Sequence, residues 1–347
     1  MSPSATAQWL FLVVALWMKS AIADNHGMAS TAEPGVFPSF EEVGIATDEF
    51  EIKFSNIHII YKMAVFPSDK HFCENAFLFV FIPTRPSSFE IREAIRSSWV
   101  GDRPSNVVAK FIIGMTEDSE VFDLLLDEQN MFGDLILYDI EDNYANLYLK
   151  VHAAFNWQQA YCGKAEYILK TDDDTIVDLH RLLYWIEHDM SIRQQTNPAI
   201  IFGRLEEKGK PIRVESSKWY LSREAYPSNY FPPFVYGGTY LMSNQAVSAI
   251  LRNTRYIQVI PNEDVLFTGL VSTQAGISRM DATKYFRVER TLRLREKCQD
   301  NVPFITSLYG FYQVTEFAEN YMALRSVQCP INSTSSHFFG LMGKQRV

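Results

Sequence analysis

Three consecutive aspartates, Asp172–Asp174, directly follow a short apolar segment, Tyr167–Leu169, near the middle of the chain. Such a segment is typical of a buried strand, so the three carboxylates are expected in the loop at its end. Open α/β sheets bind their ligands at strand ends of this kind. Adjacent carboxylates repel one another, and Mg²⁺ or Mn²⁺, which prefer carboxylate and phosphate oxygens, would offset that repulsion. For the motif taken alone, a solvated acidic turn is the alternative.

The order of apolar segments predicts an α/β fold with a largely parallel sheet. Alternating strands and helices imply right-handed crossovers, and residues 147–155 carry apolar side chains at helical spacing. Strands are expected at 76–82, 108–114, 134–138, 167–170 and 200–204, and helices from residue 89, from 147 and at 180–190. Residues 226–240, rich in Pro, Gly and Tyr, are expected to form a loop with an aromatic lining. No element is assigned after residue 290.

Arg92, Arg96 and Trp99 share one face of the helix expected from residue 89, because they follow each other at helical spacing. Ser87 and Glu90 have the spacing of a capping box at its start. Two arginines on one stripe can bind a phosphate or a carboxylate. A solvated face with surface ion pairs is the alternative.

The amino-terminal segment indicates entry into the secretory pathway. The apolar run Trp9–Met18 is shorter than the roughly 20 residues of a spanning helix, and Ala21–Ala23 has the form of a signal-peptidase site. Residues 1–23 are therefore predicted to be a signal peptide or short signal-anchor, with a buried helix as the alternative. Residues 24–52 are predicted to be a stem or linker, 53–330 the folded domain and 331–347 a tail.

Net charge and cysteine content narrow the classes of ligand and the cellular compartment that the chain is expected to have. The formal net charge of −9 disfavours nucleic-acid binding through a basic face. The four cysteines match no zinc spacing, and in an oxidising compartment one or two disulfides are expected, with the pairing left open. Asn332 begins a glycosylation sequon.

Several blocks of residues, taken in order from about residue 76 to 270, resemble the β-1,3-galactosyltransferase family, the inverting glycosyltransferases that include β-1,3-N-acetylglucosaminyltransferases and the Fringe proteins. No single block is specific, but their order makes coincidence a poor explanation. The blocks are Arg92–Trp99, Phe111–Gly114, Gly133–Ile136 with Asp139, Asp142, Tyr144, Asn146, Leu147 and Lys150, then Cys162 with Ala165, Tyr167 and Lys170–Asp174, Tyr226–Pro227 with Tyr230, Tyr236–Gly238 with Tyr240, and Glu263–Val265 with Gly269.

The resemblance implies a GT-A fold, a Rossmann-like nucleotide-sugar-binding domain with a mixed, mostly parallel sheet, at residues 53–330. It implies transfer of a hexose, most often galactose, from a UDP-sugar to a hydroxyl of a glycan acceptor on a glycoprotein or glycolipid, forming a β-1,3 linkage. Mn²⁺ would assist as a Lewis acid. It also implies a Golgi-luminal protein, either a type II membrane protein held through the N-terminal segment or a secreted one.

Residue roles follow from the same resemblance. Asp264 would take the proton of the acceptor hydroxyl as the general base, although an ordinary acidic helix start also explains this block. Asp172 and Asp174 would hold the metal, with Asp174 as its direct ligand. Contacts to the donor are expected from Arg92, Arg96, Lys170, Asp172, Asp173, Gly237, Gly238 and Glu263.

The chain departs from the family pattern at two places. Ile176 stands where an aromatic residue is usual. Many members have a metal-binding histidine near the carboxyl end, but residues 304–312 contain none. The metal would then be held by Asp174, the diphosphate and water.

Two other functions are compatible with parts of the sequence. A non-catalytic relative that binds UDP or a glycan is consistent with the missing histidine. A phosphatase of the haloacid dehalogenase type loosely fits Asp172-x-Asp174, but Lys170-Thr171 interrupts the apolar approach. A P-loop enzyme is disfavoured because no G-x-x-x-x-G-K motif occurs. The donor sugar and the acceptor are not determined by the sequence.

Overall fold

The computed structural model describes residues 39–293 and 295–329, with the side chains of 68 and 70 left out. The predicted signal segment, the sequon at Asn332 and the tail at 331–347 lie outside these ranges. Among the helices of the described part, none combines the length and the apolar character that crossing a bilayer requires.

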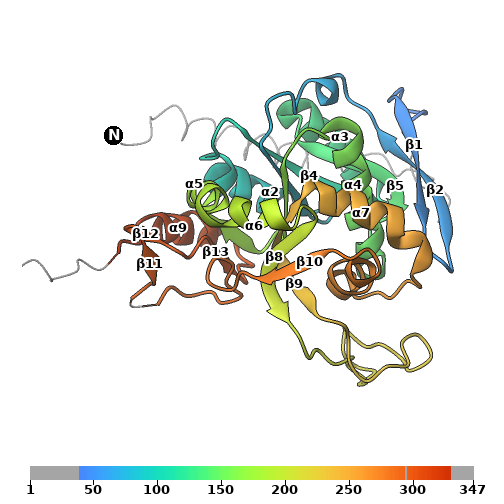
Figure 1. Cartoon of the computed structure of the whole chain (residues 1–347). Helices are drawn as coiled ribbons and strands as arrows, with labels where there is room; N and C mark the ends of the chain where they lie inside the picture. The colour runs from blue at the N-terminus through green and yellow to red at the C-terminus, as the bar shows by residue number, and fades with distance from the viewer. Residues whose placement is uncertain (1–38, 294, 330–347) are drawn as a thin grey trace, which may run out of the picture. The chain divides into compact units, whose positions relative to one another are not determined.

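A nine-stranded mixed sheet forms the centre of the fold, in the order β1-β2-β5-β4-β3-β6-β9-β8-β10 (Figure 1). Strands β3, β4, β5 and β6 run parallel, β9 lies antiparallel between β6 and β8, and β10 runs parallel to β8. This confirms the predicted α/β class with mostly parallel central strands. The strands are β1 (Thr47–Lys53), β2 (His58–Ala64), β3 (Leu78–Pro83), β4 (Val107–Met115), β5 (Leu135–Glu141), β6 (Tyr167–Thr171), β8 (Ile200–Glu206), β9 (Phe234–Ser243) and β10 (Ser278–Asp281).

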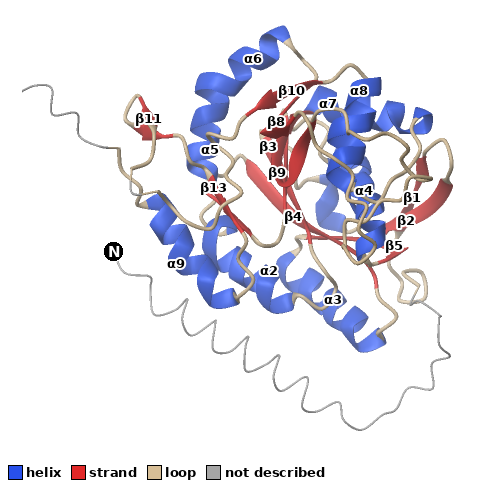
Figure 2. Cartoon of the chain, turned by 90° about the horizontal axis from the view of Figure 1, so that it is seen from below, coloured by secondary structure: helices blue, strands red, loops and turns tan. Residues whose placement is uncertain are grey.

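Helices cover both faces of this sheet (Figure 2). Strand β3 explains why, because its side chains alternate between two hydrophobic cores. Leu78 and Val80 pack on one side with α2, α3, α5 and α9, whereas Phe79 and Phe81 pack on the other with α4 and α7. The helices are α2 (Phe89–Ile95), α3 (Ser119–Phe132), α4 (Leu147–Tyr161), α5 (Leu179–Trp185), α6 (Ser191–Thr196), α7 (Asn244–Asn253), α8 (Ser272–Gln274) and α9 (Val314–Arg325).

Short elements complete the fold. Helical segments of 3₁₀ or π type are η1 (Pro67–Lys70), η2 (Arg96–Val100), η3 (Tyr144–Asn146), η4 (Ile186–Met190), η5 (Thr254–Tyr256) and η6 (Val265–Val271). Two small antiparallel pairs join β11 (Cys298–Gln299) to β12 (Val302–Pro303) and β7 (Thr175–Val177) to β13 (Ser307–Tyr309).

The structure corrects two expectations and adds elements where the sequence assigned none. The stretch 226–240 is not a loop throughout, because β9 begins at Phe234 and lies inside the main sheet. The capping box does not form, since Ser88 is the N-cap of α2 and its side chain makes no capping hydrogen bond. Beyond residue 290, where the sequence assigns no element, the chain forms β11, β12, β13 and α9. Strand β1 also begins at Thr47, within the segment predicted to be a stem.

Two disulfides resolve the open cysteine pairing. Cys73 bonds to Cys162, and Cys298 bonds to Cys329. The first bridge joins the segment before β3 to the end of α4. The second bridge closes a loop of chain that contains β12, β13 and α9. Each of the four cysteines is therefore paired.

Candidate active site

The three aspartates form the turn between β6 and β7, as the sequence predicts. The N–H of Thr175 donates to the carbonyl of Asp172 at 3.2 Å and closes this turn. The N–H of Asp172 donates to the carbonyl of Gly238 at 3.0 Å. Because β9 runs antiparallel to β6, the early part of β9 lies beside the end of β6. The aspartates and the glycine pair, distant in sequence, therefore meet at one edge of the sheet.

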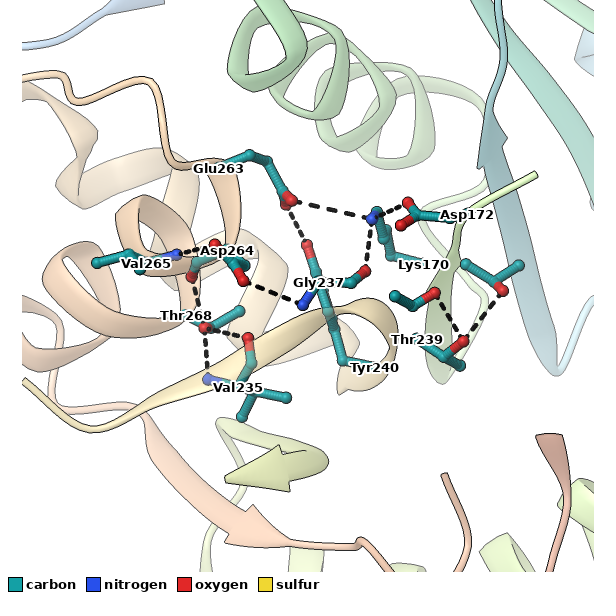
Figure 3. A network of polar contacts seen from close by, with 12 residues as sticks. Lys170, Asp172, Val235, Gly237, Thr239, Tyr240, Glu263, Asp264, Val265 and Thr268 are labelled. Atoms are coloured by element: carbon teal, nitrogen blue, oxygen red, sulfur yellow. Dashed lines mark hydrogen bonds and ion pairs between the residues drawn. The ribbon is translucent and has the colours of Figure 1, made fainter. Parts of the chain in front are cut away.

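Lys170 is the buried cation of this edge. Its side chain is 1% exposed, pairs with Asp172, donates to the carbonyl of Gly237 at 2.5 Å and lies 3.9 Å from Glu263 (Figure 3). Burial alone would lower the pKa of Lys170, but the charges of Asp172 and Glu263 outweigh it and raise that pKa. Lys170 therefore keeps its charge at neutral pH.

Asp264 begins segment η6 and points its carboxylate back at β9. Its Oδ1 accepts from the N–H of Val265 at 2.8 Å and its Oδ2 from the N–H of Gly237 at 3.2 Å (Figure 3). Burial raises the pKa of Asp264, and the N–H bonds of Val265 and Gly237 oppose that rise. The carboxylate is thus oriented by two fixed backbone donors and is only partly covered.

Glycine at position 237 allows this approach. A Cβ atom there would stand 3.3 Å from Cβ and 3.5 Å from Oδ2 of Asp264. A side chain beyond that Cβ would press on the carboxylate, which explains a glycine inside a strand.

Glu263 lies behind Asp264 and is 4% exposed. It accepts a hydrogen bond of 2.6 Å from the hydroxyl of Tyr240 (Figure 3). Burial raises the pKa of Glu263 to about 7, although Lys170 acts in the opposite direction. Glu263 therefore holds the ammonium of Lys170 and the hydroxyl of Tyr240 in place through buried contacts.

The aspartate turn carries more negative charge than its neighbours compensate. Burial, together with Asp172 and Asp173, raises the pKa of Asp174 to about 7. Burial and Asp172 also raise the pKa of Asp173. A cation beside Asp174 would relieve this repulsion.

The residues present fit a divalent cation that completes its coordination with other ligands. Asp172 and Asp174 supply oxygen atoms, the donors that Mg²⁺ and Mn²⁺ prefer. Within 39–293 and 295–329 there is no group of three or more His, Cys, Asp or Glu arranged to hold a metal. A cation of the Mg²⁺ type ordinarily binds through one or two carboxylates plus phosphates and water.

Arg92 and Arg96 lie in a buried ion-pair cluster with other partners. Arg92 is fully buried, pairs with Glu128 at 2.6 Å and donates to the carbonyls of Arg85 and Pro86. Arg96 pairs with Glu128 at 2.6 Å and with Asp134 at 2.7 Å. Their described contacts hold α2 to α3 and to the start of β5, and do not join them to the aspartate turn. Trp99 is buried in the core.

Two aromatic residues at the site were given no role by the sequence. Tyr240 anchors Glu263 and belongs to the strand mistaken for a loop. Tyr309 of β13 lies against Gly238, where an added Cβ would stand 3.0 Å from the tyrosine ring. Burial raises the pKa of Tyr309, with Asp174 and Asp172 adding to the rise. Only the pairing of β13 with β7 reveals that placement, because more than a hundred residues separate the two in sequence.

The comparisons with known proteins agree with this geometry. The galactosyltransferase family model matches residues 90–283, which is more than half of the chain. The chain belongs to the galactosyltransferase family. The resemblance seen in the sequence is thereby confirmed, and the family match contains the aspartate turn, the Gly237–Gly238 pair and Asp264.

Individual proteins similar to this chain are named beta-1,3-galactosyltransferases. It is 32% identical over 206 residues to beta-1,3-galactosyltransferase 1 of Mus musculus and of Homo sapiens, covering 58% of this chain and 61% of each relative. It is 30% identical over 247 residues to beta-1,3-galactosyltransferase 4 of Mus musculus, covering 62% of this chain and 66% of the relative. The chain thus spans less than two thirds of the length of these relatives.

Proposed function

We propose that the protein is an inverting glycosyltransferase that moves a hexose, galactose in the first instance, from a UDP-sugar to a hydroxyl of a glycan acceptor and forms a β-1,3 linkage. Membership of the galactosyltransferase family and the names of its relatives support this proposal. The observation that carries it is the placement of Asp264. Its carboxylate is held by two backbone N–H groups at the same sheet edge as the aspartate turn.

In this proposal Asp264 acts as the general base. Inversion requires the acceptor oxygen to attack the anomeric carbon from the side opposite the departing UDP, so a carboxylate must take the hydroxyl proton as the new C–O bond forms. A raised pKa makes Asp264 a stronger base than an exposed aspartate. The N–H bonds from Val265 and Gly237 keep it oriented while the proton moves.

We further propose that Asp172 and Asp174 hold a divalent cation, Mn²⁺ in the first instance, together with the donor diphosphate. When bound, the cation supplies positive charge to the leaving group as a Lewis acid. Lys170 pairs with Asp172 and orients it, and Asp173 belongs to the same turn. UDP affinity that is equal before and after exhaustive chelation would contradict this assignment.

The donor contacts proposed here are Lys170, Asp172, Asp173, Gly237, Gly238 and Glu263, because they lie at one sheet edge. We propose that Glu263 acts indirectly, since it is buried behind Lys170 and Tyr240. Arg92 and Arg96 are proposed to support the fold through Glu128 instead. A loss of UDP affinity without loss of stability, on changing Glu128, would restore them to the donor site.

Replacing Asp264 by Asn tests the function directly. The substitution keeps the shape of the side chain but removes the base, so the turnover number should fall by about 10²–10⁴-fold. UDP binding in the presence of Mn²⁺ should remain as in the wild type. The assay is transfer from UDP-galactose to methyl β-N-acetylglucosaminide and methyl β-galactoside, with the linkage of any product determined by NMR.

Exposed Asp123 on α3 provides a matched control, because Asp123→Asn makes the same chemical change on a helix that carries none of the proposed site residues. Its transfer rate should equal that of the wild type. Full transfer by Asp264→Asn would remove this residue from the mechanism. A wild-type protein that binds UDP but transfers nothing from any UDP-sugar would instead favour the non-catalytic alternative.

We also propose a luminal location in the secretory pathway, the Golgi in the first instance. The two disulfides support an oxidising compartment. A tagged full-length chain found in the cytosol would contradict this location.

A further inference from the structure

Residues 207–233, between β8 and β9, extend beyond the ends of these strands (yellow in Figure 1). Arg213 gives this segment a defined shape. Its guanidinium donates to the carbonyls of Leu221, Ser222, Tyr226 and Ser228 at 2.6–2.9 Å. Because one half-buried guanidinium binds four carbonyls, the segment is organised before any ligand binds.

Two half-exposed aromatic side chains meet where this segment reaches the start of α4. Trp219 belongs to the segment and Tyr144 to η3, and each is 50% exposed. The ammonium of Lys218 lies 4.7 Å from the centre of the Trp219 ring and 5.1 Å from the centre of the Tyr144 ring. One cation bound to both rings fixes the two aromatics beside each other.

This aromatic pair lies at the carboxyl edge of the parallel strands, the edge that also carries the aspartate turn. Tyr144 follows the end of β5, and β5 runs parallel to β4, β3 and β6. Near Tyr144, the ammonium of Lys150 donates to Asp142 at 2.6 Å and to the carbonyl of Thr84, just after β3, at 2.8 Å. Burial raises the pKa of Tyr144, and the charge of Asp264 is the next largest cause, followed further on by Asp172 and Glu263. The raised pKa of Tyr144 agrees with its place at this edge, although no function has so far been given to it or to Trp219.

Half-exposed aromatic rings beside a reaction centre suit a ligand with one apolar face. A pyranose ring has such a face, made of its C–H groups, and a rim of hydroxyls that stay hydrated or form hydrogen bonds. Tyrosine and tryptophan bury an apolar surface while keeping a polar group at the edge. Lone exposed apolar residues need no explanation, but a fixed pair at a reaction centre does.

We propose that Tyr144 and Trp219 form the subsite that stacks the accepting sugar of the glycan acceptor, placing one of its hydroxyls at Asp264. This inference rests on the proposed function for the role of Asp264. Lys218 is a positioning residue that holds the two rings together. The uracil ring of the donor is the competing occupant, and the experiment separates the two.

The experiment measures binding, so that it does not depend on turnover. Methyl β-galactoside and methyl β-N-acetylglucosaminide are titrated by ligand-observed NMR against protein loaded with UDP and Mn²⁺. Both Trp219→Ala and Tyr144→Ala should weaken the binding of at least one glycoside by about tenfold or more. Trp219→Phe should retain most of the affinity because it keeps an aromatic face.

Tyr256→Ala is the matched control, since Tyr256 is 60% exposed on η5 and touches neither ring. It should bind the glycosides as the wild type does. UDP affinity is measured for every variant and should not change.

The inference is overturned if both alanine variants bind the glycosides like the wild type, or if the wild type binds neither glycoside. It is also overturned if the variants lose UDP affinity instead, which would assign the rings to uracil. Glycoside binding that needs both rings, in a protein that consumes no UDP-sugar, leaves the subsite standing and rejects the proposed transfer.

Discussion

Asp264 combines a structural and a proposed chemical task in one carboxylate. It starts η6 by accepting from the N–H of Val265, so the interpretation of this block as an acidic helix start is correct as far as it goes. Its second oxygen accepts from Gly237 on a different element. That second bond turns the side chain toward the sheet edge, which a capping role alone does not require.

His152 makes stability depend on pH. It is 2% exposed on α4, it packs beside the rings of Phe54 and Phe267, and burial lowers its pKa to about 3. The unfolded chain binds a proton near pH 6.5 and the folded chain does not, so stability falls as pH falls from about 6.5 toward 3. At pH 5 the resulting loss in the free energy of unfolding is about 2 kcal/mol.

We therefore expect His152→Gln to reduce the loss of unfolding free energy between pH 7.5 and pH 5 by about 2 kcal/mol. Urea unfolding at the two pH values measures this loss. His188→Gln, at an exposed histidine, is the control and should show the wild-type difference. Equal pH dependence in wild type and His152→Gln would show that His152 is not the titrating group.

At the scale of elements, the cluster of Arg92, Arg96 and Glu128 ties α2 to α3. Both arginines bond to the same buried carboxylate, and Asp134 binds only Arg96. Neutralising Glu128 leaves Arg92 as a buried charge without a carboxylate. Breaking one partner of a buried pair typically costs about 3–5 kcal/mol.

Glu128→Gln should accordingly lower the free energy of unfolding by about 3 kcal/mol, while UDP affinity of the folded variant stays unchanged. Asp127→Asn makes the same kind of change at the preceding, exposed position of α3 and should cost less than about 0.5 kcal/mol. Calorimetric UDP titrations and urea unfolding give the two quantities. Wild-type stability with weakened UDP binding would place the arginines at the donor instead.

The elements also show which parts of the site are predictable from sequence. Strands β3, β4, β5 and β6 are continuous apolar runs, and such runs are evident without a structure. Strand β9 is not, because Gly237 and Gly238 give it the composition of a loop. Glycine is needed at these positions because the side chains of Asp264 and Tyr309, residues far away in sequence, pack closely against the backbone there.

The partners of Arg92 illustrate the same limit. Spacing along α2 places the arginines on one face, but it does not say that Glu128, 36 residues later, covers that face. Local periodicity identifies a surface of an element. The residue that packs against this surface is set by tertiary contacts, which a single sequence does not contain.

At the scale of the whole molecule, the site depends on chain that lies beyond the family match. That match ends at residue 283, whereas β13 pairs with β7 and the N–H groups of Gly310 and Phe311 both donate to the carbonyl of Asp174 at 2.9 Å. The C-terminal segment therefore supports the aspartate turn directly. It also brings Tyr309 to Gly238.

Removing one disulfide should therefore have a different effect on stability and on the site from removing the other. Cys73–Cys162 spans 89 residues and Cys298–Cys329 spans 31. Chain entropy predicts that removing the first costs about 4–5 kcal/mol and removing the second slightly less, about 4 kcal/mol. The second bridge, however, encloses β13, so its loss frees the segment that supports Asp174.

Serine pairs at each bridge test this contrast, and each double variant is the control for the other. Cys73→Ser with Cys162→Ser should show the larger loss of unfolding free energy and, where folded, wild-type UDP affinity. Cys298→Ser with Cys329→Ser should show weaker UDP binding at a temperature where the fold is intact by circular dichroism. Equal UDP affinity in both would mean that β13 holds its place without the bridge, because its pairing with β7 and the bonds to Asp174 suffice.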